Sequence, residues 1–83
     1  MTNDEAVWLR GIGKRVRLAR FTREMTQGQL AAATGMSRSF VSLIEQGTHG
    51  VDVVRLYRLA AALDIPLTEL VAGALAQRER GDK

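Results

Sequence analysis

Cysteine is absent from the 83-residue sequence, and histidine occurs once, as His49. Without thiols the chain forms neither disulfides nor thiolate metal sites, and a cysteine nucleophile is excluded. A single histidine argues against a histidine-rich metal site and against a Ser-His-Asp triad. The remaining residues assemble neither paired catalytic carboxylates nor a phosphate-binding loop. We therefore predict a protein that is not an enzyme and that needs no metal or cofactor.

Long apolar runs are missing as well. No window contains the roughly 18 apolar residues of a membrane helix. The first ten residues carry Asp4 and Glu5 where a signal peptide would be basic, and they contain no apolar stretch of signal-peptide length. These features predict a cytoplasmic protein without a membrane partner.

The charge and hydrophobicity of the chain describe a small folded domain that favours anions. It has 12 basic and 9 acidic residues, a formal net charge of +3 and a pI of about 10.2. Hydrophobic residues make up 46% of the chain and charged residues 25%, as in globular proteins. Positions 10 to 23 hold six basic residues and no acidic one, interleaved at helical spacing with Ile12, Val16 and Ala19. This run indicates either a solvated helix face or a surface for nucleic acid.

Two short helices joined by a glycine turn are predicted in the middle of the chain. Thr26 and Gln29 have the spacing of a capping box, which starts the first of them, and Gly35 suits the left-handed residue that ends it. Ser37 caps the second helix, over residues 38–46. Two helices of about eight residues around such a turn are typical of a helix-turn-helix.

A longer helical segment precedes this pair. Thr2 and Glu5 also have capping-box spacing and can start a helix. Gly11 and Gly13 have low helix propensity, so we expect a kink or a break there.

Two further helices follow the pair. Asp52 can cap a helix over residues 53–63, and Pro66 separates it from the last helix. The last helix carries an apolar stripe at i, i+3, i+4, i+7 and i+8, formed by Leu67, Leu70, Val71, Ala74 and Leu75. This stripe is broader than the core of so short a chain needs, so we expect part of it to form the interface of a homodimer.

The predicted fold class is all-α, a compact five-helix domain that contains the helix-turn-helix. No strand-like alternation or internal repeat is present. A single domain is expected over residues 1–83, with its core at about 12–75 and flanking segments at 1–9 and 77–83.

From residue 12 to residue 71 the chain resembles the DNA-binding domains of the Cro and lambda-repressor type, the XRE family. The stretches that carry the resemblance are Ile12–Arg20, Met25–Ala31, Gly35–Ser37, Val41–Gly47 and Leu59–Leu63. Within the family, Arg38–Ser42 and Gly50–Asp52 are most similar to the controller proteins of restriction–modification systems. The family commonly has glycine where this chain has Glu24, which predicts strain at the end of the first helix.

The resemblance implies that the helix over 38–46 is a recognition helix in the DNA major groove. At its first turn, Arg38 can donate two hydrogen bonds to guanine, with a phosphate contact or a surface ion pair as the alternative. Gln27 has no evident structural role and is expected to contact phosphate. The predicted DNA-binding residues are Arg38, Ser39, Ser42, Gln27, Thr26, Phe40, Thr48, His49 and Arg17.

Several of these residues have a second interpretation. Thr26 can act purely as a helix cap, Phe40 can belong to the core, and His49 can simply be exposed. In the family the glutamate at Glu45 pairs with the arginine at Arg20, so we predict a structural ion pair there.

The resulting hypothesis is a regulator that binds double-stranded operator DNA with an inverted repeat, as a homodimer associated with the nucleoid. A restriction–modification controller is its sharpest version, and RNA polymerase is a possible further partner. A phage-type repressor or an antitoxin uses the same domain. A protein-interaction module on this scaffold is the alternative from another class, although the polar and cationic face around Arg38 favours DNA.

Overall fold

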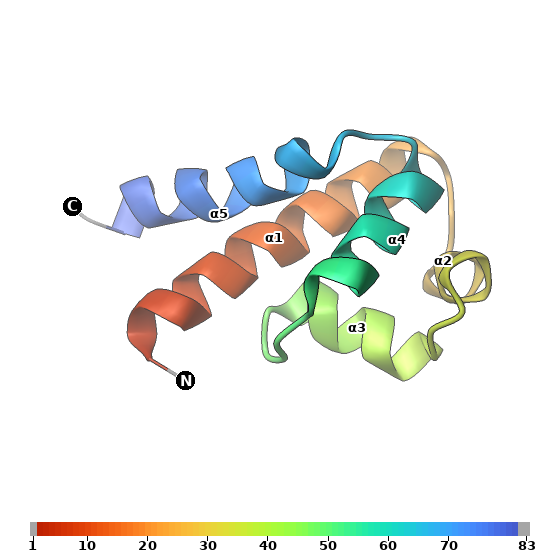
Figure 1. Ribbon diagram of the computed structural model, residues 1–83, viewed down its shortest axis with the longest axis horizontal. Helices are drawn as coiled ribbons and strands as arrows, with labels where there is room; N and C mark the ends of the chain where they lie inside the picture. Colours follow the sequence, from red (N-terminus) through yellow and green to blue (C-terminus); the bar gives the residue numbers. More distant parts are fainter. Residues whose placement is uncertain (1, 82–83) are drawn as a thin grey trace.

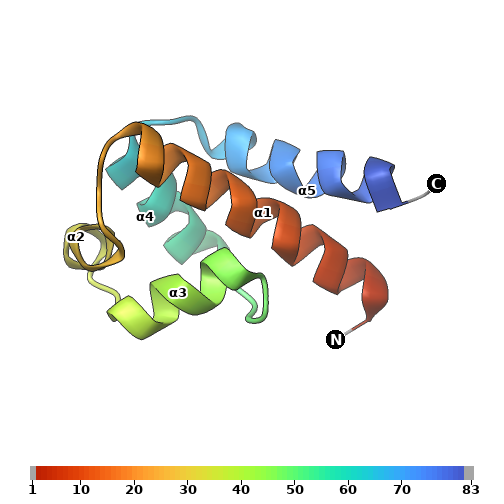
Figure 2. The same ribbon diagram turned by 180° about the vertical axis from the view of Figure 1, so that it is seen from behind.

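The computed structural model describes the backbone of residues 2–81 and the side chains of residues 2–76. These residues form five helices and no strand, which confirms the predicted all-α fold. The helices are α1 (Asn3–Thr22), α2 (Gln27–Thr34), α3 (Arg38–Gln46), α4 (Val53–Leu63) and α5 (Leu67–Gly81). On one side of α1 lies α5, running antiparallel to it, and on the other side lies α3 (Figures 1 and 2).

The predicted break in the first helix was wrong, because α1 runs without interruption for 20 residues. It begins at the predicted capping box, in which the Thr2 hydroxyl accepts from the Glu5 backbone N–H and the Glu5 carboxylate accepts from that of Thr2. A Cβ on Gly13 would collide with the carbonyl oxygens of Ile44 and Glu45 in α3. The glycine therefore serves close helix packing, and this packing outweighs its low helix propensity.

The caps of α2 and α3 are those that the sequence predicts. The Thr26 hydroxyl accepts from the Gln29 backbone N–H at 3.0 Å, and the Gln29 side chain accepts in return from the Thr26 N–H at 2.8 Å. Gly35 ends α2 with φ of 71°. The Ser37 hydroxyl accepts from the Phe40 N–H at 3.0 Å, and α3 ends at Gly47 with φ of 72°. These caps fix both ends of the helix-turn-helix independently of the core.

The core contains side chains from every helix. The largest side chains that are fully buried are Val16, Leu30, Val41, Leu59, Leu63 and Leu70. Among the described residues, no single helix combines the length and apolar character needed to cross a membrane, and α4 with residues 67–76 passes that test only as a pair bent by 110°.

The predicted dimer stripe on the last helix requires a correction. Leu70 and Ala74 are buried against α1 and the core, so they cannot lie on a surface that a second copy contacts. Leu67 is half-buried in the same direction, whereas Val71 and Leu75 remain exposed. The reason is that α5 packs along the length of α1, with Gly73 against the Gly11 carbonyl oxygen.

The two predicted flanking segments continue the terminal helices. Residues 3–9 form the first turns of α1, as the capping box at Thr2 and Glu5 predicts, and the backbone of α5 continues to Gly81. Residues 82 and 83 lie outside the described residues.

Glu24 adopts the left-handed conformation, with φ of 55°, where glycine is common in the family. We expect Glu24→Gly to raise the free energy of unfolding by about 0.5–1 kcal/mol, or the Tm by about 2–8 °C, because relief of the strained φ exceeds the entropy that glycine adds to the unfolded chain. Thermal unfolding followed by circular dichroism measures the shift. The matched control is Gly35→Ala, which must lower the Tm, since its φ is positive and its added Cβ meets no atom within 4 Å. An unchanged or lower Tm for Glu24→Gly would contradict this account.

Candidate nucleic-acid interface

The surface of α3 that faces away from the core is polar. Successive helix positions rotate by about 100°, so the buried Val41 and Ile44 face one side and residues 38, 39, 42, 43 and 46 face the other. Together with Gln27 at the start of α2, four of these outward residues line an open hollow of about 400 Å³: Arg38, Ser39, Ser42 and Leu43. The structure thus places four predicted residues together, namely Gln27, Arg38, Ser39 and Ser42.

Arg38 is the dominant charge of this hollow. Its side chain is exposed at the first turn of α3, and within residues 2–76 it makes no hydrogen bond or ion pair. The Ser39 hydroxyl has no partner in the same part of the chain, whereas the Ser42 hydroxyl accepts from the Gln46 amide at 3.1 Å. The guanidinium can therefore offer its planar set of donors to a ligand outside the protein.

Towards α1 and α2, the hollow is bordered by a buried ion pair. The Arg20 Nε donates to Glu45 Oε2 at 2.7 Å, and its Nη2 donates to Oε1 at 3.0 Å. A third bond runs from Nη1 to the Met25 carbonyl at 2.8 Å. Hydrogen bonding to Glu45 raises the pKa of the Arg20 guanidinium, although burial acts in the opposite direction. The structure contains the predicted pair, and Arg20 carries its charge at all working pH values.

Gln27 does have a structural partner, contrary to the expectation from the sequence. Its amide nitrogen donates to Glu45 Oε1 at 3.2 Å, so the Glu45 carboxylate accepts hydrogen bonds from both Arg20 and Gln27. Arg17 lies beside this group, with its guanidinium 5.3 Å from the centre of the Phe21 ring. We call Arg17 and Gln27 the α1–α2 rim.

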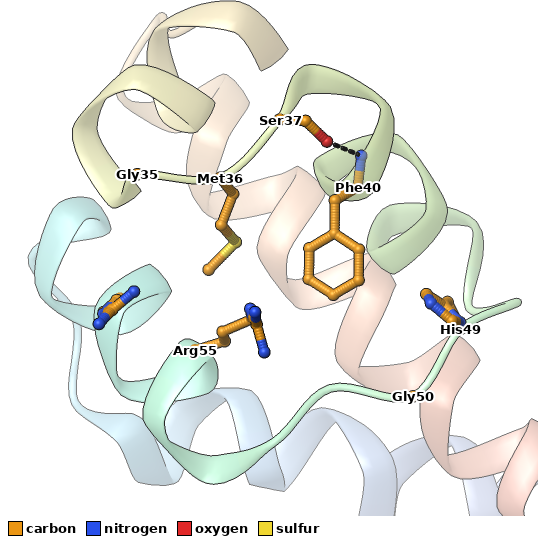
Figure 3. A pocket seen from close by; sticks show the side chains of 8 residues that line it. Gly35, Met36, Ser37, Phe40, His49, Gly50 and Arg55 are labelled. Carbon is orange, nitrogen blue, oxygen red and sulfur yellow. Dashed lines mark hydrogen bonds between the residues drawn. The ribbon is translucent and has the colours of Figure 1, made fainter.

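Beyond the opposite edge of α3 lies a second hollow, of about 530 Å³, which Figure 3 shows. The Phe40 side chain points from α3 into it, its ring meeting the His49 ring edge-on at 5.4 Å and 86°. The Arg55 guanidinium lies 5.4 Å from the centre of the Phe40 ring, and Arg58 lines the same hollow. Phe40 and His49 therefore pack on each other beside α4, away from Arg38.

Arg55 and Arg58 were not predicted as binding residues. The signal in the sequence that could have identified them is their i, i+3 spacing on the first two turns of α4, which places both side chains on one face of the helix. Arg55 pairs with Asp52, the cap of α4, and its backbone N–H lowers the pKa of that carboxyl. We call His49, Arg55 and Arg58 the α4 rim.

The two threonines predicted to bind DNA are engaged within the protein. The Thr26 hydroxyl serves the capping box of α2. The Thr48 hydroxyl donates to the Leu43 carbonyl oxygen at 3.4 Å. Both are exposed, so these bonds assign them a structural role without removing them from the surface.

Sequence comparison identifies the family. A model of helix-turn-helix proteins (HTH_3) matches residues 16–70. The chain belongs to the helix-turn-helix family. This match confirms the predicted helix-turn-helix fold and the family that the sequence resembles.

Individual relatives of this helix-turn-helix protein are named as transcriptional regulators. It is 40% identical over 60 residues to the HTH-type transcriptional regulator SlrR of Bacillus subtilis (strain 168), covering 71% of this chain and 40% of SlrR. It is also 40% identical over 55 residues to the HTH-type regulator y4dJ of Sinorhizobium fredii, covering 64% of this chain and 71% of y4dJ. The chain thus spans well under half of SlrR.

Solved structures agree with this assignment. The restriction-modification controller protein C.AhdI from Aeromonas hydrophila matches 75% of this chain and 94% of its own, with 39% identity and a TM-score of 0.73. The clp gene regulator ClgR from Corynebacterium glutamicum matches 90% of this chain and 81% of its own, with a TM-score of 0.83 at 21% identity, which shows a shared fold.

The ion pair of the helix-turn-helix unit yields a stability prediction. Glu45→Ala leaves the Arg20 guanidinium without its partner, although that side chain is only 9% exposed. We expect the free energy of unfolding to fall by about 2–4 kcal/mol in urea or thermal unfolding. The control is Arg23→Ala, which removes the exposed pair with Asp64 at 3.9 Å and should have almost no effect. A melting curve unchanged by Glu45→Ala would overturn the structural role of the pair.

Proposed function

We propose that the protein binds operator DNA in a sequence-specific manner as a homodimer, with α3 in the major groove. The observation that carries this proposal is the Arg38 guanidinium on the outward face of α3, between the two rims, which has no partner among the described residues. An arginine at this place can donate to O6 and N7 of guanine. Base contacts of this kind give specificity, whereas phosphate contacts set position.

The placement of the two rims matches the arrangement of the groove, which has a phosphate backbone on each side. The major groove is about 12 Å wide and is bordered by two phosphate backbones. Glu45 and Phe40 occupy the two flanks of the α3 face, so the α1–α2 rim and the α4 rim lie on opposite sides of it. With α3 in the groove, each rim would meet one backbone, and the first-turn amides of α2 would add donors to phosphate.

The similarity to C.AhdI, over almost all of that chain, supports a role as the controller of a restriction–modification system. Such a regulator would act in the cytoplasm on nucleoid DNA. It would change transcription by blocking or recruiting RNA polymerase at an inverted-repeat operator.

Selection of bound duplexes from a random DNA pool, at near-physiological salt, tests the proposal. We expect an enriched inverted repeat with half-sites about 34 Å apart. Arg38→Ala should weaken binding about 5- to 150-fold and relax the preference for one guanine, as loss of a bidentate base contact does. Arg58→Ala, the matched control, should weaken all sequences equally and reduce the salt slope by about 1. An enriched sequence that Arg38→Ala leaves unchanged would contradict the proposed base contact of Arg38. If the wild type binds no DNA even at low salt, a protein-interaction module is favoured instead.

The homodimer has its own test. Val71 and Leu75, four residues apart on α5, are 41% and 50% exposed and are what remains of the predicted stripe. We expect Leu75→Glu to shift sedimentation at tens of micromolar from dimer to monomer, while circular dichroism shows that the monomer keeps its helical content, because the residue is outside the protomer core. Leu18→Glu on α1, which is also exposed, is the control and should leave the dimer intact. A wild-type monomer at that concentration would contradict the dimer, and loss of the dimer with Tyr57→Glu alone would place the interface on α4.

A further inference from the structure

Leu43 is an apolar residue in an otherwise polar hollow. It is 39% exposed, and the other residues that line the hollow are Gln27, Arg38, Ser39 and Ser42. The other large apolar side chains of α3 point elsewhere, with Val41 and Ile44 in the core and Phe40 towards α4. A lone leucine is far smaller than the apolar patches that mark protein interfaces. A ligand of the hollow, rather than a protein interface, is therefore the expected contact of Leu43.

The backbone of Leu43 is held at the end of α3. Its carbonyl oxygen accepts from the Thr48 N–H at 3.3 Å and from the Thr48 hydroxyl at 3.4 Å. The Gly47 N–H points to the same carbonyl. The loop after α3 thus fixes where the Leu43 side chain starts, and Thr48 is a positioning residue for it.

We infer that Leu43 reads the C5 methyl group of a thymine in the major groove, an inference that rests on the proposed DNA binding. Thymine presents a methyl group at that edge beside its O4 acceptor, whereas guanine, cytosine and adenine present hydrogen-bonding atoms and no methyl group. A leucine over those atoms would remove their water without replacing the hydrogen bonds, which is unfavourable. Leu43 therefore selects for thymine and against the other three bases.

The position of this thymine follows from helix geometry. Leu43 lies five residues after Arg38, which corresponds to about 7.5 Å along the helix axis. Base pairs are about 3.4 Å apart, so the two side chains are separated by about two base-pair steps. The thymine should lie two or three base pairs from the guanine that Arg38 contacts.

Deoxyuridine, which lacks only the C5 methyl group, gives a direct test. Each thymine of the selected half-site is replaced singly by deoxyuridine, and the Kd is measured for the wild type and for Leu43→Ala. For the wild type we expect one position at which the Kd rises about fourfold, the effect of burying one methyl group. Leu43→Ala should bind thymine and deoxyuridine there equally well. Leu43→Met, which keeps an apolar side chain of similar reach, should retain the preference.

Leu18→Ala is the matched control and should keep the fourfold difference. It also removes an exposed leucine, but from a hollow between α1 and the α4–α5 connection. Discrimination that persists in Leu43→Ala, or that the wild type shows at no thymine, would overturn the inference while leaving operator binding intact. If the wild type enriches no duplex, the proposed DNA binding fails and this inference fails with it.

Discussion

The orientation of α3 depends on the single guanidinium of Arg20. It comes from α1, binds both carboxylate oxygens of Glu45 in α3, and reaches the Met25 carbonyl just before α2. A planar guanidinium that binds a carboxylate through two donors and a carbonyl through a third tolerates little rotation. The relative positions of α1, α3 and the segment before α2 are therefore fixed. Gln27 adds a third bond to the Glu45 carboxylate. Among the described residues, no buried side-chain nitrogen or oxygen is left without a hydrogen bond.

Close helix packing supports this polar junction from the other side. Gly13 allows the end of α3 to approach α1 until a methyl group would no longer fit, and Gly11 faces Gly73 where α5 crosses. Two glycines within one helix reduce its intrinsic propensity by roughly 1 kcal/mol each. The contacts of α3 and α5 on opposite sides of α1 offset this cost (Figure 1). The stability of α1 thus depends on the whole fold, which is why the 20-residue helix continues without a break at its two glycines.

Features set by neighbouring residues could be predicted from the sequence, and features set by distant ones could not. The caps at Thr26, Ser37 and Asp52 depend on contacts within three residues, and they lie where the spacing placed them. The break at Gly11 and Gly13 was wrong because what those glycines meet is more than 30 residues away. The apolar stripe on α5 has the right periodicity, but periodicity does not say whether α1 or a second copy covers Leu70 and Ala74. The same holds for Phe40, whose partner Arg55 belongs to another helix.

For the proposed DNA binding, the positions of the charged side chains matter more than the net charge of the chain. A net charge of +3 is modest, and α3 contains a carboxylate that would repel phosphate if it faced outward. Arg20 binds that carboxylate, and the Glu45 side chain is only 4% exposed, so the ion pair that orients α3 also keeps the negative charge off the outward face proposed to meet DNA. What remains outside is Arg38 between the two rims, with Leu43 farther along the helix. A cationic group near one end of this face and an apolar group towards the other make its two ends chemically different. Such a face can favour one orientation along a DNA sequence, whereas a uniformly basic helix of equal charge would not.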